Sequence, residues 1–220
     1  MTSLNMKEIT ENTYRELHFS DGFIELQYGI IFLCTSFIYF SLMTRSDIST
    51  LSILALCLMP ALMIPYKSHI TVPRIGYAVI PEKKLIHSNI ITFVCVLMST
   101  LGALFLGGLI LIVDKFSLSS TLSGILLRVS PILIALLIGF NFLSIARETQ
   151  LRFYRVSGIA MMLIGIIFSS TALAKTYTAT HLMLLIIGII MLLTGISKLI
   201  VFIRNNPLQQ NINFKKEEYK

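Results

Sequence analysis

The chain has 220 residues and a formal net charge of +7, and 55% of its residues are apolar while only 13% are charged. Its mean hydropathy is +0.81. A water-soluble domain of this length needs far more polar side chains to cover its surface, so the composition excludes a soluble globular protein and indicates a membrane protein.

A polar segment begins the chain and ends at Asp21. It mixes acidic and basic residues and lacks the apolar core of a signal peptide, so we expect no cleavage and assign residues 1–22 to the cytoplasm. Asp21 and Gly22 mark the start of the first span. There a carboxylate can accept hydrogen bonds from the free N–H groups of the first helical turn.

Six stretches with almost no charged residue fill the rest of the chain. A hydrocarbon core of about 30 Å needs roughly 20 apolar residues in a helix. We therefore predict an all-α, polytopic transmembrane bundle over residues 23–204, followed by a polar tail, 205–220, that we expect to be disordered and cytoplasmic. The six predicted helices are 24–44, 50–66, 88–113, 121–145, 156–174 and 181–203.

Short turns at 45–49, 114–120 and 175–180 join these helices into three antiparallel hairpins. Of the 18 Lys and Arg residues, fourteen lie in or next to the helix ends on the side of the two chain ends, three lie on the opposite side, and Arg128 lies deeper within a span. Basic short loops stay in the cytoplasm, which predicts a multi-pass protein of the inner (plasma) membrane with both termini cytoplasmic. The same bias accounts for the net charge, so we expect anionic lipid headgroups at the cytoplasmic face as partners, and no nucleic acid.

Small residues recur on single helix faces. In lipid, helices associate through close packing, and small side chains show where this can happen. We expect these faces to make helix contacts within the chain, with homodimerisation as the alternative. The pairs are Ala103 with Gly107, Ala135 with Gly139, Gly158 with Gly165, and Gly188 with Gly195.

Charged residues at membrane depth are rare and are functional candidates. Glu25 falls at the inner end of the first span, where its expected partners are inner-loop cations such as Arg74 or Arg152. Arg128 lies about a third of the way into the fourth span, within snorkelling reach of the interface. Either Arg128 pairs with Asp114 at the outer end of the preceding helix, or it lines an outward-facing cavity and contacts an anionic solute or lipid.

The most distinctive pattern is Thr71-Val72-Pro73-Arg74-Ile75-Gly76-Tyr77, in the inner loop after the second span. Apolar β-branched and aromatic runs on either side of Pro and Gly predict a tight turn or a small hairpin. Arg74, Gly76 and Tyr77 are candidate contacts for a partner or ligand. The alternative is a rigid turn in which Tyr77 lies at the headgroup level, while Arg74 caps a helix carbonyl or holds a phosphate.

This loop resembles the Pro-Arg-x-Gly-Tyr loop of a group of uncharacterised prokaryotic multi-span membrane proteins. The resemblance covers residues 21–84 and extends to Arg152-Phe153-Tyr154 in the next inner loop. It implies a membrane setting and no particular activity.

The sequence carries no catalytic, nucleotide-binding or metal-binding pattern, so we expect no enzyme activity and no cofactor. The leading interpretation is a membrane-embedded binding or assembly protein, or an accessory subunit, that forms a homo-oligomer or joins another membrane protein. The alternative is a small transporter or channel subunit for a solute or ion. Proton coupling is disfavoured, because no charge-free stretch contains a second acid beside Glu25.

Overall fold

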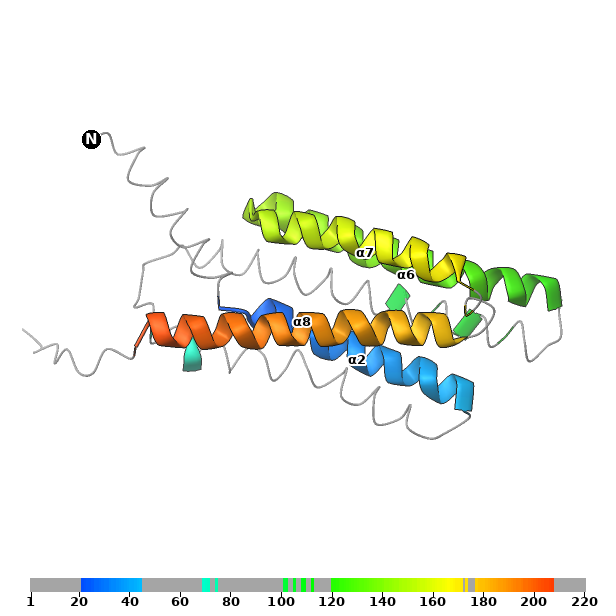
Figure 1. Cartoon of the computed structure of the whole chain (residues 1–220), viewed down its shortest axis with the longest axis horizontal. Coiled ribbons are helices and arrows are strands. Elements are labelled where there is room, and N and C mark those ends of the chain that lie inside the picture. Colours follow the sequence, from blue (N-terminus) through cyan, green and yellow to red (C-terminus); the bar gives the residue numbers. More distant parts are fainter. Residues whose placement is uncertain are drawn as a thin grey trace, which may run out of the picture.

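The computed structural model describes residues 21–44, 69–71, 74, 101–102, 105, 108–109, 112, 120–171, 173 and 177–207. Within these ranges the chain forms four long helices and no strand. The helices lie roughly along one common direction (Figure 1). They are α2 (Phe23–Thr44), α6 (Ser120–Thr149), α7 (Arg152–Ser170) and α8 (Tyr177–Asn205).

Each of these four helices is long and apolar enough to cross a membrane. The all-helical prediction is confirmed for this part of the chain, and the four candidate spans indicate a membrane protein. The remaining two predicted spans lie mainly outside the described residues. Of the stretch 88–113, positions 101–102, 105, 108–109 and 112 are described, and they are helical.

The observed helix ends differ from the predicted ends by at most four residues. Differences of four residues occur at two connections. Between α7 and α8, α7 already ends at Ser170 and α8 begins at Tyr177; between α6 and α7, α6 continues to Thr149 and α7 begins at Arg152. Basic side chains can extend a helix beyond its apolar stretch, because their long stems lie along the apolar surface while their charged heads reach water. Predicted boundaries that stop at charged residues therefore end such helices too early.

The connection between α6 and α7 is consequently very short. Gln150 has a φ of 59°, in the left-handed region, which reverses the chain directly after the helix. Its backbone N–H still donates to the carbonyl of Ala146 at 2.9 Å. The Thr149 hydroxyl accepts a hydrogen bond from the Leu151 N–H at 3.3 Å, so the turn is closed by its own polar groups.

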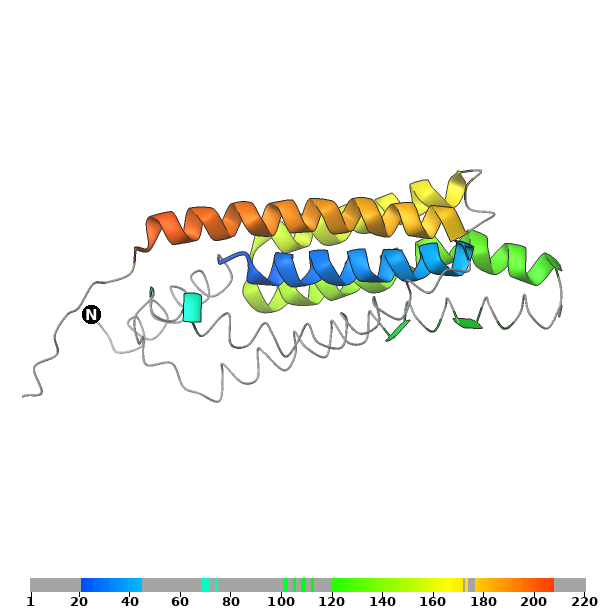
Figure 2. The ribbon, with the colours of Figure 1, turned by 90° about the horizontal axis from the view of Figure 1, so that it is seen from below.

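The helices pack as two antiparallel pairs, α2 along α8 and α6 along α7 (Figures 1 and 2). Glycines allow the backbones of α2 and α8 to approach closely. A Cβ atom at Gly29 would lie 2.7 Å from the backbone nitrogen of Leu192, and one at Gly195 would lie 2.6 Å from that of Leu26. Gly188 meets Leu33 in the same way. Side chains at these glycines would force the two helices apart.

Small residues also allow the second pair, α6 and α7, to approach closely. A Cβ atom at either Gly139 or Gly158 would lie 2.9 Å from the carbonyl oxygen of the other residue. A Cβ atom at Gly165 would overlap the side chain of Ala135. The predicted small-residue faces of α6, α7 and α8 therefore make contacts within the chain, as expected. Ala103 and Gly107 lie outside the described residues.

Pro131 lies inside α6, where its ring removes one backbone N–H donor. The sequence predicts a loosened helix with free carbonyl groups at this point. The structure instead provides hydroxyl donors: Ser130 Oγ donates to the carbonyl of Leu127 at 2.9 Å, and Ser169 Oγ of α7 donates to that of Arg128 at 2.5 Å. The carbonyl of Leu127, which lacks the Pro131 N–H, is thus bonded within α6, and the neighbouring carbonyl of Arg128 holds α7.

Substitution of Gly165 by Val should destabilise the bundle, because the added side chain meets Ala135 at a distance that real contacts do not reach. Overpacking of this kind costs about 1–3 kcal/mol. We expect the unfolding temperature in detergent to fall by several degrees. Gly124→Ala is the matched control, since nothing lies within 4 Å of its added Cβ. It should leave the temperature unchanged or raise it, and an equal fall in both variants would contradict this account.

Candidate functional site

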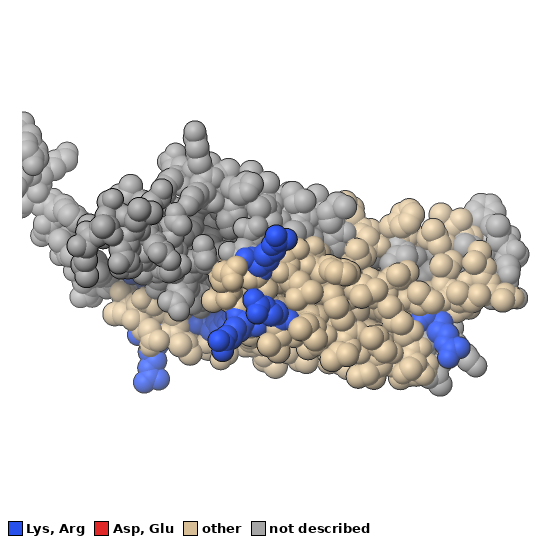
Figure 3. All heavy atoms as spheres, turned by 90° about the horizontal axis from the view of Figure 1, so that it is seen from above, with Lys and Arg blue, Asp and Glu red and all other residues tan. Residues whose placement is uncertain are grey.

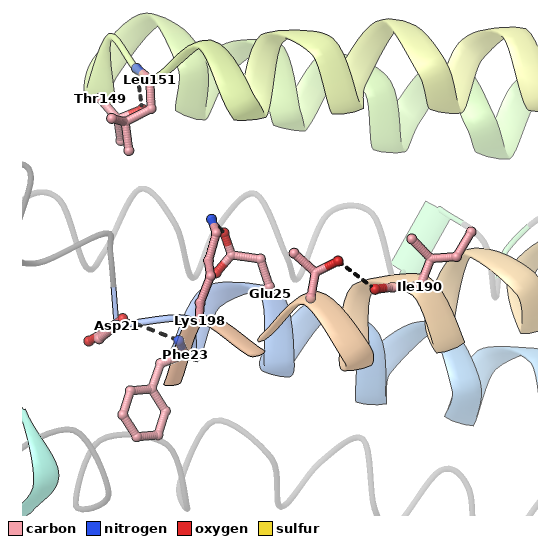
Figure 4. A network of polar contacts seen from close by, with 8 residues as sticks. Asp21, Phe23, Glu25, Thr149, Leu151, Ile190 and Lys198 are labelled. Atoms are coloured by element: carbon pink, nitrogen blue, oxygen red, sulfur yellow. Dashed lines mark hydrogen bonds and ion pairs between the residues drawn. The ribbon is translucent and has the colours of Figure 1, made fainter. Parts of the chain in front are cut away.

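Asp21 lies at the start of α2 and has no exposed surface. Its Oδ1 accepts a hydrogen bond from the backbone N–H of Phe23 at 3.2 Å, so the predicted capping role is confirmed (Figure 4). Gly22 has a φ of 77° and lies against the carbonyl of Gly195, which leaves no room for a side chain. This end of α2 is therefore fixed by its cap and by contact with α8.

The second oxygen of Asp21 reaches a different part of the chain. Oδ2 accepts a hydrogen bond from the Thr71 hydroxyl at 3.1 Å, and Thr71 is buried as well. Thr71 is the first residue of the distinctive inner-loop motif. One carboxylate thus links the start of the first span to this loop.

Arg74 belongs to the same motif, and its Nη1 donates to the carbonyl of Ile70 at 2.7 Å. Its backbone N–H donates to the carbonyl of Thr71 at 3.1 Å. As a structural residue, Arg74 is expected either to cap a helix carbonyl or to hold a phosphate. In the structure, its side chain binds a helix carbonyl. Gly76 and Tyr77 lie outside the described residues.

Glu25 lies one turn after Asp21 on α2, and its side chain is also fully buried. Its Oε1 is 2.5 Å from Nζ of Lys198 on α8 (Figure 4). The expected partners, Arg74 and Arg152, are therefore wrong. The close contact of α2 with Gly195 aligns the two helices so that Lys198, three residues further along α8, lies beside Glu25.

Two aromatic rings of α7 complete the surroundings of this ion pair. Nζ of Lys198 lies 3.8 Å from the ring centre of Phe153 and 5.5 Å from that of Tyr154. Tyr154 is fully buried. A cation over an aromatic face is attracted by the ring quadrupole. We refer to Glu25, Phe153 and Tyr154 as the ammonium cage.

An aromatic cluster extends from the cage into the bundle. The ring of Phe142 on α6 lies 6.0 Å from that of Tyr154 and 4.7 Å from that of Tyr28 on α2. Tyr28 and Phe142 are buried, and both belong to the core. The cluster therefore joins α2, α6 and α7 at the level of the ion pair.

The structure thus buries two carboxylates one turn apart, whereas the sequence offered no second acid beside Glu25. The difference arises because Asp21 lies outside the charge-free stretches, where its residue type predicts only a helix cap. Packing of Thr71 and α8 over the start of α2 covers it. The two carboxylates have separate partners: both oxygens of Asp21 accept hydrogen bonds, from a backbone N–H and a hydroxyl, while Oε1 of Glu25 contacts an ammonium group.

A second set of polar contacts lies at the opposite end of the bundle. Nδ1 of His181 lies 2.8 Å from Oγ of Ser36, whose hydroxyl donates to the His181 carbonyl at 2.9 Å. Nδ1 also lies 3.0 Å from the Ser36 carbonyl, which makes it a donor in this arrangement. Ser130 and Thr180 are 2.9 Å apart and join α6 to α8. These groups hold the helices together.

Arg128 is exposed on α6, and its predicted partner Asp114 lies outside the described residues. The other exposed basic residues that the structure describes gather at the end where α2 begins and α8 ends. Blue side chains crowd this end in Figure 3, and the visible face carries no acidic side chain among the residues drawn in colour. The exposed arginines are Arg147, Arg152, Arg155 and Arg204.

Across the described ranges, no three His, Cys, Asp or Glu side chains are grouped as a metal site requires. Comparison with known proteins found no matching family model, no matching curated protein and no matching solved structure. The resemblance of the inner-loop motif to other membrane proteins therefore stays a prediction.

Separating the buried charges should destabilise the protein strongly. Removal of one partner from a buried ion pair costs about 3–5 kcal/mol, because the other charge is left without compensation. We expect Glu25→Gln and Lys198→Met to lower the unfolding temperature individually. The double variant should recover much of the loss. A double-mutant cycle measured by thermal unfolding in detergent checks this, and simple additivity of the two losses would contradict the pairing.

Thr71→Val should leave the buried Oδ2 of Asp21 without its hydroxyl donor. An unsatisfied buried polar group costs about 1–3 kcal/mol, more when it is charged. We expect a lower unfolding temperature and faster proteolysis of the inner loop. Thr71→Ser keeps the donor and serves as the control. Equal behaviour of the Val and Ser variants would show that this hydrogen bond does not anchor the loop.

Proposed function

We propose that the protein is a non-enzymatic, six-span membrane protein of the plasma membrane, with both termini cytoplasmic, and that it binds anionic lipid headgroups as a binding or assembly subunit. The observation that carries the proposal is the concentration of exposed arginines at one end of the bundle. There the carboxylates of Asp21 and Glu25 are buried, so the exposed side chains that the structure describes at this end carry positive charge.

The direction of the helices supports the proposed topology. α2 and α7 begin at the basic end, while α6 and α8 finish there (Figure 1). Two further spans between α2 and α6 would keep this alternation. Basic residues flanking each helix at one end match the positive-inside rule, which assigns that end to the cytoplasm.

Charge and chemistry favour a lipid phosphate as the group bound there. The guanidinium group presents paired donors that match phosphate oxygens. Each basic residue near an anionic membrane surface contributes about 1 kcal/mol of attraction. Arg152 and Arg155 are three residues apart on α7, so they share one side of the helix beside the short turn that follows Arg147.

A transporter or channel subunit is the second candidate. The specific observation that favours it is the burial of Asp21 and Glu25 next to a lysine, since ionisable residues within spans mark many ion pathways. Cation flux across proteoliposomes that is lost in Glu25→Gln would support this candidate. Absence of such flux in the wild-type protein would leave the binding function as the better account.

Replacement of Arg152 and Arg155 by Gln should weaken retention of anionic lipid. Loss of two attractions of about 1 kcal/mol each predicts a decrease in affinity of roughly tenfold or more. Native mass spectrometry from nanodiscs that contain phosphatidylglycerol measures the lipid retained. Arg128→Gln removes an exposed arginine away from this end and is the control. Unchanged lipid retention in the double variant would overturn the proposed site.

A further inference from the structure

The Lys198 ammonium group is held in the way that proteins hold cationic ligands. A carboxylate oxygen lies 2.5 Å from Nζ, and the Phe153 ring centre lies 3.8 Å from it. The second ring, of Tyr154, lies at 5.5 Å. A carboxylate combined with aromatic faces is a general solution for recognition of organic ammonium ions. Here the ion that occupies it belongs to the protein itself.

The two partners differ in their access to the outside. Glu25 has no exposed surface, whereas 27% of the Lys198 side chain is exposed. A lysine stem is flexible and can carry its head toward the headgroup region. The carboxylate cannot follow it. Departure of Lys198 would therefore leave a buried charge that requires another cation.

The residues next to Phe153 and Tyr154 in the sequence indicate which kind of molecule would carry a cation that replaces Lys198. Arg152 directly precedes Phe153, and Arg155 directly follows Tyr154; both arginines are exposed while Tyr154 faces inward. An ammonium group in the cage would thus lie at the same turn of α7 that carries two exposed arginines. A ligand that carries both a primary ammonium and a phosphate satisfies both sets of side chains.

We propose that the ammonium cage of Glu25, Phe153 and Tyr154 is a binding site for primary ammonium groups, which Lys198 occupies when no ligand is bound. The phosphoethanolamine headgroup of a phospholipid has this chemistry, and so does a free soluble amine. This inference deepens the proposed lipid-binding function and rests on it for the membrane setting. Exchange requires no net change of charge in the cage, because one ammonium replaces another.

The internal lysine sets the strength of binding. A tethered occupant competes at an effective concentration of about millimolar or above. Wild-type protein should therefore bind ligand ammonium groups weakly, and removal of Lys198 should raise the apparent affinity. A primary ammonium should be preferred over a trimethylated one, because the contact with Glu25 uses an N–H donor.

The first experiment is a chemical rescue of full-length Lys198→Ala in detergent. We expect its unfolding temperature to be several degrees below that of wild type and to rise with millimolar propylammonium chloride, but not with sodium chloride at the same ionic strength. The matched control is the Glu25→Gln/Lys198→Ala double variant, which should not respond to propylammonium. Failure of rescue in the single variant, or equal rescue in the double variant, would overturn the proposal.

The second experiment distinguishes the two sources of the ammonium. Native mass spectrometry of wild-type protein from nanodiscs should show several-fold greater retention of phosphatidylethanolamine than of phosphatidylcholine, and Glu25→Gln should abolish the preference. Displacement of the lipid by soluble ethanolamine at low millimolar concentration would identify a free amine as the better ligand. A wild-type protein that neither prefers the ethanolamine lipid nor binds ethanolamine would show Lys198 to be a permanent occupant and would overturn the proposal.

If Lys198→Ala does not fold, lipid retention by the Phe153→Leu variant tests the proposal instead. This variant keeps the ion pair and removes only the nearer aromatic face, so the preference for the ethanolamine lipid should fall several-fold. An unchanged preference would count against the cage. Phosphatidylglycerol retention, followed in the same spectra with the Arg152 and Arg155 variants, tests the proposed function independently of the cage.

Discussion

The pairing of Glu25 with Lys198 limits how the helices can be arranged. Removal of the cation beside a buried carboxylate is strongly destabilising, and a shift of α8 by one turn along α2 would separate Glu25 from Lys198. The same ammonium faces Phe153 and Tyr154, so the position of α7 depends on it as well. Three helices thus take their alignment from one charged contact near the end of the bundle.

The rest of the packing follows the requirements of a lipid solvent. Lipid tails are as apolar as leucine side chains, so helices gain little from hydrophobic association alone. Glycines bring α2 to α8 and α6 to α7 along the middle of each pair. Polar contacts lie toward the two ends, with Asp21 and Glu25 at one and His181 with Ser36 at the other. Close contact supplies attraction, and the polar pairs specify alignment.

The extent to which this arrangement could be predicted depends on how local each feature is. The spans α2, α6, α7 and α8 and the Asp21 cap follow from length, apolarity and residue type within one segment. The partner of Glu25 depends on the register between helices distant in the sequence. Arg74 and Arg152 lie in inner loops that are expected near Glu25, whereas Lys198 lies near the inner end of the last predicted span. One feature of the sequence does indicate this pairing: Lys198 lies three residues after Gly195, on a helix face that is expected to pack against another helix.

The distance along the chain between the two charges has a consequence for biogenesis. Lys198 follows Glu25 by 173 residues, and Thr71 follows Asp21 by 50. At a synthesis rate of about 5–20 residues per second, roughly 9–35 s separate the appearance of Glu25 from that of its counter-ion. During this interval α2 must keep an uncompensated acid near water. Final insertion of α2 into the bundle therefore awaits translation of α8.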